Sequence, residues 1–220
     1  MSLIEGVAKQ TTAVDRVSEG VTRGLRMLRD GTIGIADFIA LLSLEGRVFT
    51  ANVGFATTPV AFNATLTTTT FDLHVAVPSS VYIIPLELMV AYEVYGTTAL
   101  QETVMQSGSG SVVGTTNTAV TPISSNVSTG IASLCTIKQI ANAGTALTTN
   151  IKELFRDTQQ KVVTLATVTD IRDAAPYVKR WFAMQSGCLD IVGPSQQLVV
   201  WASAQAGQGY IMLKYAEIPV

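Results

Sequence analysis

The stretch TFDLHVAVPSSVYIIPLELMVAYEV, residues 70–94, decides the fold class of this chain. Apolar side chains recur at every second position in residues 71–77 and again in residues 84–94. A period of two places one face of a strand on a core and the other toward solvent. The intervening Pro78-Ser79-Ser80 has turn chemistry, so the stretch predicts two neighbouring strands joined as a hairpin. Pro85 has no backbone donor and is expected at an edge or a bulge.

Residues 51–150 continue this pattern with very few charges. They hold a single cationic side chain and four acidic ones, at Lys138, Asp72, Glu87, Glu93 and Glu102. Charged residues make up 14% of the whole chain, whereas an ordinary soluble domain has roughly 25%. Since no apolar run approaches the roughly 18 residues of a membrane helix, we expect no membrane span. Such a surface predicts burial between subunits, and therefore a homo-oligomer.

The residues before Gly46 have a different pattern. Apolar side chains recur there at intervals of three and four, at Val14, Val17, Val21, Leu25 and Leu28. This spacing predicts a short amphipathic helix that Asp30-Gly31 ends, and Asp37 is a suitable N-cap for a second short helix through Leu44. We therefore divide the chain into a helical N-terminal arm, residues 1–45, and a β domain, residues 46–220.

The β domain contains about eight strand candidates, which is the number expected of a two-sheet antiparallel jelly roll. They are centred near Val48, Phe71, Leu88, Ile137, Leu165, Trp181, Val200 and Leu213. The predicted fold class is therefore all-β: a jelly-roll sandwich with a short helical N-terminal arm.

Three connections have signals of their own. Residues 106–130 are rich in Gly, Ser, Thr and Asn, which predicts a long loop or a loop with one short strand inside it. Asn150 with Glu153 matches a capping box, which predicts one or two helical turns through Gln160. Residues 204–209 contain glycines and predict a hairpin connection between the last two strands.

No pattern of catalytic residues is present. His74 is the single histidine, and a metal site needs several ligands, so we expect an ordinary surface or interface side chain and no bound metal. Glu87 and Glu93 lie about 20 Å apart on one strand, too far for a pair of glycosidase carboxylates. No nucleotide-binding or nucleophile motif occurs. The sequence predicts a protein that is not an enzyme and binds no cofactor.

The charge balance argues against strong nucleic-acid binding. The formal net charge is -2, and phosphate binding needs clustered cations. Arg23, Arg26 and Arg29 recur along one side of the predicted helix. They are either a solvated helix face or a contact to phosphates inside a shell. We expect weak or no direct nucleic-acid binding.

The cysteines and tryptophans also have two interpretations each. Cys135 and Cys188 fit no metal or redox spacing and are expected as buried thiols. Trp181 and Trp201 are expected in the core or in an interface, with stacking on sugar rings as the alternative. The N-terminal residues have no secretory signal pattern, so synthesis and assembly in a host cytoplasm are expected.

The mixed-charge arm, the strands rich in Thr, Val, Ala and Ser, the long polar loops and the final KYAEIPV, residues 214–220, together form a familiar pattern. The chain resembles the single jelly-roll capsid proteins of small icosahedral viruses and bacterial viruses. It departs from many RNA-packaging members because it lacks a strongly basic arm. That departure puts genome contact in doubt and leaves a minor capsid, vertex or decoration protein open.

The resemblance implies a virion protein that self-assembles into a shell and contacts copies of itself and other virion proteins. The arm would exchange between neighbours. From apolar periodicity we expect the subunit interface to include Leu25, Leu28, Phe38, Leu42, Tyr92, Tyr95 and Trp181. The alternative function is a carbohydrate-binding or adhesion module of a virion tail, fibre or decoration protein.

Overall fold

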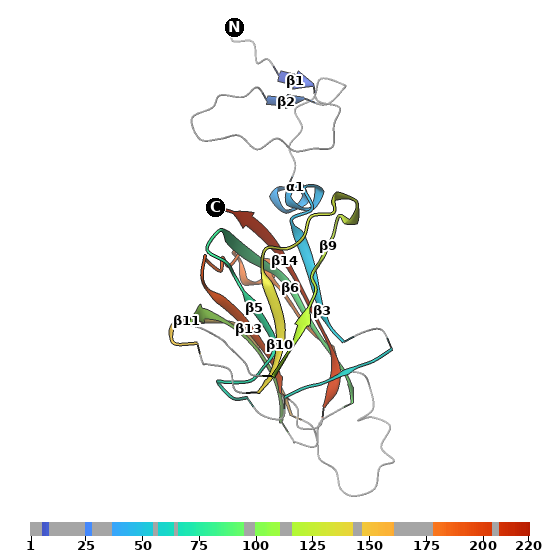
Figure 1. Cartoon of the computed structure of the whole chain (residues 1–220), viewed down its shortest axis with the longest axis vertical. Helices are drawn as coiled ribbons and strands as arrows, with labels where there is room; N and C mark the ends of the chain where they lie inside the picture. The colour runs from blue at the N-terminus through green and yellow to red at the C-terminus, as the bar shows by residue number, and fades with distance from the viewer. Residues whose placement is uncertain are drawn as a thin grey trace, which may run out of the picture.

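The chain folds as a sandwich of two six-stranded sheets, with one short helix at an end of the sandwich (Figure 1). The computed structural model describes residues 6–8, 25–27, 37–54, 57–63, 66–94, 100–110, 116–142, 147–160, 178–203 and 207–220. The helix is α1, Phe38–Leu44, and two short 3-10 turns follow later, η1 at Val127–Thr129 and η3 at Ala183–Ser186.

Sheet I has the strand order β12-β6-β14-β3-β9, with β4 paired to β14. Its strands are β12 (Val178–Phe182), β6 (Val81–Val94), β14 (Gln208–Pro219), β3 (Val48–Val53), β9 (Ile123–Ser124) and β4 (Val60–Ala61). Sheet II has the order β11-β7-β13-β5-β10-β8. Its strands are β11 (Thr149–Gln160), β7 (Leu100–Ser109), β13 (Gln197–Ser203), β5 (Phe71–Ala76), β10 (Thr136–Asn142) and β8 (Thr116–Val120).

Eight of these strands pair in a nested order. The antiparallel pairs are β3 with β14, β5 with β13, β6 with β12 and β7 with β11. The frame is thus one long hairpin whose two arms cross together from sheet to sheet, since β3 and β6 lie in sheet I and β5 and β7 in sheet II. The pairs β14–β6 and β13–β7 complete the sheets. This is the predicted jelly roll, with β8, β9 and β10 inserted between β7 and β11.

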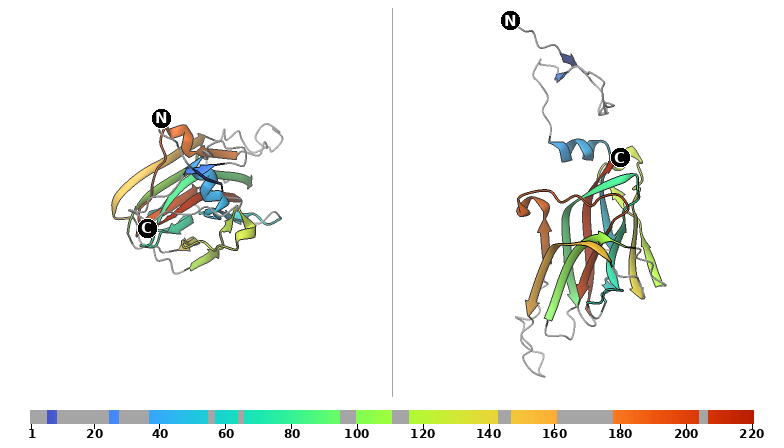
Figure 2. Two further views of the ribbon diagram at one scale, coloured as in Figure 1. Left: turned by 90° about the horizontal axis from the view of Figure 1, so that it is seen from above. Right: turned by 90° about the vertical axis from the view of Figure 1, so that its left-hand side faces the viewer.

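The core lies between the two sheets. Figure 2 shows the strands of the sandwich in two further views. Leu73 and Val75 of β5 face it from sheet II, and Val90 and Leu213 face it from sheet I, all fully buried. Each such side chain contributes roughly 1.5–3 kcal/mol when it leaves water. The period of two in the sequence is the direct cause of this layer.

The predicted hairpin over residues 70–94 is wrong in one respect. Its two strands exist, but β5 belongs to sheet II and β6 to sheet I, so the turn at Pro78 crosses between sheets. Alternation fixes which face of a strand is apolar and does not fix its partner. Pro85 does lie at a bulge, because Tyr215 pairs with Pro85 while the adjacent Lys214 pairs with Glu87.

Three other connections differ from expectation. The helical turns predicted after Asn150 are instead β11, because pairing with β7 continues from Thr149 to Gln160 and overrides the local capping signal. Residues 106–130 contain the end of β7, then β8, β9 and η1, so they are more ordered than the predicted loop. Strands β13 and β14 lie in different sheets and form no hairpin.

The second helix predicted before Gly46 is confirmed as α1. Asp37 caps α1 as predicted, since its carboxylate accepts the backbone N–H groups of Ile39 and Ala40 at 2.8 and 3.1 Å. Where the first predicted helix would end, the structure instead has β2, Leu25–Met27, paired in parallel with β1, Gly6–Ala8. A short helix that cannot bury its stripe is marginal, whereas strand pairing satisfies the backbone. The remainder of that helix, and the strand predicted near Leu165, lie outside the described residues.

Candidate interaction surfaces

The predicted interface residues divide into three groups. Phe38 is 52% exposed on α1 and remains free to contact a partner. Leu42, Tyr92 and Trp181 are buried inside the single chain, which leaves their side chains little surface for another subunit. The rest lie outside the described residues or have side chains that do, namely Leu25, Leu28 and Tyr95, as do the arginines Arg23, Arg26 and Arg29.

Helix α1 lies across one end of the sandwich with a narrow buried stripe. Leu42 packs with Val48 of β3, Ile84 of β6 and Ala216 of β14. The helix spans seven residues, so a single buried leucine fixes its orientation while Phe38 and Leu44, each 52% exposed, face away. The end of the sandwich therefore presents apolar side chains to solvent.

The insertion between β7 and β11 is fastened beside this helix. The Ser124 hydroxyl donates to the carbonyl of Gly46 at 2.9 Å, and the Asn126 side-chain amide donates to the carbonyl of Leu44 at 2.9 Å. Gly46 has φ of 77°, and a Cβ there would lie 2.2 Å from the Thr129 hydroxyl oxygen. Glycine is needed at this position both for the backbone conformation and for the close approach.

Glu217, a buried carboxylate of β14, holds the following part of the insertion. It accepts the Ser133 hydroxyl and the backbone N–H groups of Leu134 and Cys135, the Leu134 N–H at 3.1 Å. The Tyr215 hydroxyl is also within hydrogen-bond distance of Ser133, at 2.8 Å. These contacts satisfy a charge that would otherwise be costly to bury. They hold residues 133–135 rigidly against the sandwich.

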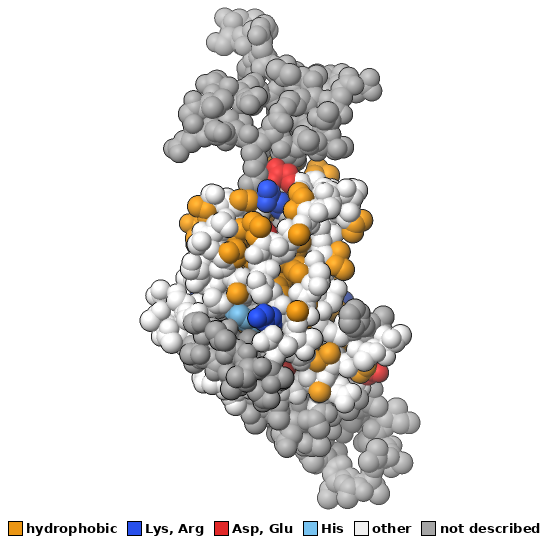
Figure 3. All heavy atoms as spheres, viewed as in Figure 1, with side chains coloured by type: hydrophobic (Ala, Val, Ile, Leu, Met, Phe, Trp, Pro, Cys, Tyr) orange, Lys and Arg blue, Asp and Glu red, His pale blue; other side chains and the backbone are white. Residues whose placement is uncertain are grey.

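Several exposed apolar side chains share this end of the molecule, and we call them the α1-end surface. They are Phe38, Leu44, Val127, Ile131, Leu134 and Val220, with exposed fractions from 37% to 78%. Figure 3 shows apolar side chains gathered over this part of the sandwich. The sequence pattern pointed only to Phe38 as an interface residue. Leu44 lies at the end of the same predicted helix, and the other four are isolated apolar residues in polar loops or at the chain end, with no periodicity to reveal them.

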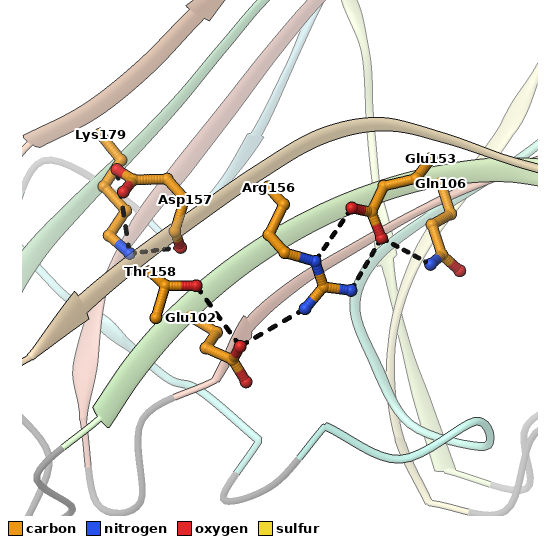
Figure 4. A network of polar contacts seen from close by, with 7 residues as sticks. All are labelled: Glu102, Gln106, Glu153, Arg156, Asp157, Thr158 and Lys179. Carbon is orange, nitrogen blue, oxygen red and sulfur yellow. Dashed lines mark hydrogen bonds and ion pairs between the residues drawn. The ribbon is translucent and has the colours of Figure 1, made fainter.

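Charged side chains gather over β7 and β11, at one edge of sheet II (Figure 4). Arg156 donates to the Glu153 carboxylate at 2.7 and 2.9 Å and approaches Glu102 at 3.4 Å, while Gln106 donates to Glu153 at 3.2 Å. The Arg156 guanidinium lowers the pKa of Glu153, and Glu153 raises that of Arg156. Arg156 pairs with both carboxylates, and these charged side chains make the β11 edge of sheet II hydrophilic.

Lys179 links the two sheets beside this cluster. Its Nζ donates to the backbone carbonyl of Asp157 at 2.9 Å and lies 5.9 Å from the centre of the Tyr92 ring. Burial lowers the pKa of Lys179, and the nearby Asp157 and Glu102 carboxylates oppose that shift. The ammonium group therefore closes one side of the sandwich.

His74 is buried, which corrects its expected place on an ordinary surface. Its Nε2 is 2.7 Å from the Gln197 side-chain oxygen, and Nδ1 has no hydrogen-bond partner among the residues that the structure describes. The outer face of β5 is covered by a second apolar cluster that includes Phe71, Val199 and Trp201. Burial lowers the pKa of His74. Residues distant in sequence supply this cover, so the strand pattern alone could not reveal it.

Asp72 is buried on the same face and holds the chain segment before β5. Its two carboxylate oxygens accept the backbone N–H groups of Asn63 at 2.8 Å and of Ala202 at 2.7 Å. Burial raises the pKa of Asp72 to about 6, although these hydrogen bonds lower it. The role of Asp72 is therefore structural, because it joins the segment before β5 to β13.

Neither tryptophan presents a ring face to solvent. Trp181 is 6% and Trp201 7% exposed, and the Trp201 indole N–H donates to the Thr67 carbonyl at 2.8 Å. Of the cysteines, Cys135 is buried as predicted, whereas Cys188 is exposed. The expectation for Cys188 is wrong because it follows η3 on a surface turn.

Within the described ranges, no three His, Cys, Asp or Glu side chains are grouped so as to hold a metal ion. The helix found in those same ranges is too short to cross a membrane. Comparison of the chain with protein-family models, curated proteins and solved structures gives no match.

Proposed function

We propose that this chain is a structural protein of a virus particle, a jelly-roll building block that associates with copies of itself into a capsid shell. The observation that supports this most is the α1-end surface. In a lone chain its apolar side chains stand in water, whereas association would remove them from it. The occupant proposed here is a second copy of the chain.

The nested hairpin makes the sandwich a rigid wedge, because each frame strand pairs with a strand distant in sequence. The α1-end surface sits on that rigid body, so contacts between copies would have a fixed geometry. Few charges at the contact keep the desolvation cost small, and many weak contacts add across a shell.

The arm has a defined place in this proposal. Residues 1–36 lead directly into Asp37 at the start of α1, beside the α1-end surface. The arm is therefore positioned to take part in contacts between neighbours, and other virion proteins are further partners of the same surface. The carbohydrate-binding alternative is not carried forward, because both tryptophans that would stack on sugars are buried.

The test compares charges introduced at exposed apolar positions inside and outside the α1-end surface. Sedimentation velocity and electron microscopy of the full chain are expected to show particles or large rings. Leu44→Glu with Val127→Glu places charges in the α1-end surface and is expected to leave monomers or small oligomers. Val178→Glu is the control, since Val178 is 43% exposed and pairs with Ala91, near the end of β6 that lies away from α1.

Two results would remove the proposal. One is a wild-type chain that stays monomeric at high concentration. The other is a double variant that assembles as well as the control. Circular dichroism of each variant checks that the sandwich is intact.

A further inference from the structure

Sheets of this kind expose backbone donors and acceptors at their edges, and three of the four edge strands are protected. Strand β12 carries Lys179 and Arg180, and β9 is two residues long and follows Pro122. Charges, prolines and short length are the usual means of preventing edge-to-edge pairing. Both strands are therefore protected against pairing with a further strand.

Strand β11 is protected by its shape and by its charges. Relative to β7 it has one extra residue between Thr149 and Lys152 and another between Glu153 and Phe155. Asn150, in the first of these bulges, has φ of 53°. Bulges bend and twist a strand, and together with the charged side chains along β11 they make it a poor template for pairing.

Strand β8 has fewer of these devices. The bulge in its pairing with β10 is one extra residue on the β10 side, between Ile140 and Asn142, at the Thr116 end of β8. Its sequence TNTAV, residues 116–120, has no charge and no proline, and its pairing with β10 has an unbroken register from Val120 to Asn117. Among the described strands β10 is its one ladder partner. Thr118 and Ala119 are exposed. A flat, uncharged edge of this kind is a ready template for another strand.

We propose that β8 pairs in antiparallel orientation with β8 of a second copy, so that sheet II continues across a two-fold axis. The strand is complementary to itself. Centred on Thr118, the pairing sets Thr118 against the same residue of the second copy and Ala119 against Asn117, with no like charges opposed. Threonine pairs across strands are favourable, and a two-fold contact uses the same patch on both chains.

Charge also favours a second copy over a charged peptide. Residues 116–120 carry no charge, and Lys138 of β10 is the one charged residue in their ladder with β10, where it pairs with Ala119. Ile123 of β9, three residues after β8 in the chain, is 57% exposed. Five residues bury far less than the roughly 800 Å² per partner of a stable interface, so the pairing is weak alone. It goes beyond the proposed function because it does not involve the α1-end surface.

A disulfide test reads out the pairing directly. Thr118→Cys in a Cys188→Ser background would place two cysteines directly opposite each other. Their Cα atoms would be about 4.5–5.5 Å apart, within the range that a disulfide spans. Mild oxidation of the full chain should then give a covalent dimer in several-fold excess over Thr158→Cys in the same background. Thr158 is the matched control because it is exposed on the protected edge strand β11.

A second variant measures the same contact without oxidation. Thr118→Lys would set two ammonium groups against each other and should lower the weight-average mass in sedimentation velocity, whereas Thr158→Lys should not. Equal cross-linking at both cysteines, or unchanged sedimentation of Thr118→Lys, would overturn the proposal. Particles that form normally despite those results would leave the proposed function standing. One further result would overturn the β8 proposal: amide exchange at residues 116–120 that is slow in the full chain and fast once residues 1–36 are removed, without any covalent dimer. That result would mean that the chain's own N-terminal segment covers the β8 edge.

Discussion

Lys179, on the edge strand of sheet I, donates from Nζ to the backbone carbonyl of Asp157, on the edge strand of sheet II, at 2.9 Å. The Asp157 carboxylate is 4.0 Å from the same nitrogen. No backbone pairing joins β11 to β12 in the described sheets, so this side-chain contact closes that side of the sandwich.

Replacing Lys179 separates the effect of its charge from that of its volume. Lys179→Met keeps the aliphatic stem and removes a buried charge, so at pH 7 the free energy of unfolding should change by less than about 1 kcal/mol or increase. Lys179→Ala leaves a void and should cost about 2 kcal/mol or more. Urea unfolding of both variants makes the comparison, and a methionine variant as unstable as the alanine one would contradict it.

The same residue predicts a pH dependence. Burial lowers the folded-state pKa of Lys179 below the ordinary value of 10.5, so the cost of its charge is fully present at neutral pH. That cost disappears as the pH rises toward 10.5, because the unfolded chain then loses the proton as well. The stability of the wild type relative to Lys179→Met should therefore rise in alkaline solution. Parallel urea titrations at pH 7 and pH 9.5 check this sign.

Glu217→Gln tests the anchor of the insertion. The Leu134 N–H donates to both Glu217 oxygens and the Cys135 N–H to one of them. A glutamine has one acceptor oxygen, so its amide group would face at least one of these backbone donors and weaken its contact. The expected cost is about 1–3 kcal/mol, with faster amide exchange at both residues. Glu87→Gln is the control, because Glu87 faces Lys214 across 4.0 Å at the surface and should change stability by about 1 kcal/mol or less. Unchanged exchange at Leu134 would count against the anchor.

Local sequence signals predict the positions of the strands and of the helix cap. The alternation around Leu73 and Leu213 located β5 and β14, and Asp37 placed the start of α1. The partner of each strand is set by contacts between residues far apart, and so β5 was paired with β6 when its true neighbours are β13 and β10.

Burial was harder to predict than strand position, for a related reason. An apolar residue at strand period fits a core and an interface equally well, and Tyr92 and Trp181 turned out to face the core. His74 alternates with apolar residues as a solvent-facing side chain would, yet Phe71 and Trp201 cover its face of the sheet. Of the α1-end surface, Phe38 and Leu44 belong to the predicted helix, and the other four residues have no repeating pattern.

Asp72 predicts a change of stability between acidic and neutral pH. Its pKa of about 6 in the folded chain exceeds the ordinary 3.8, so its contribution is most favourable below pH 3.8 and is lost as the pH rises through 6. The difference corresponds to about 3 kcal/mol. Asp72→Asn should remove this pH dependence of the free energy of unfolding. The variant should therefore be closest in stability to the wild type at pH 7. Urea unfolding from pH 4 to pH 7 measures it, and His74 cancels because both proteins contain it. Parallel curves would contradict the assignment.

Gly209→Ala tests the central pairing of sheet I. A Cβ at Gly209 would lie 2.0 Å from the Ala91 carbonyl oxygen and 3.0 Å from the Phe62 ring, so β14 would have to move away from β6. Since that contact is with backbone, no rotamer change relieves it, and the expected loss is at least about 2 kcal/mol. Gly193→Ala is the matched control, because its Cβ would meet nothing nearer than the Gln196 side chain at 3.5 Å. It should change stability by less than about 1 kcal/mol. Equal unfolding midpoints for the two variants would mean that β6 and β14 do not approach as closely at Ala91 as the jelly-roll register requires.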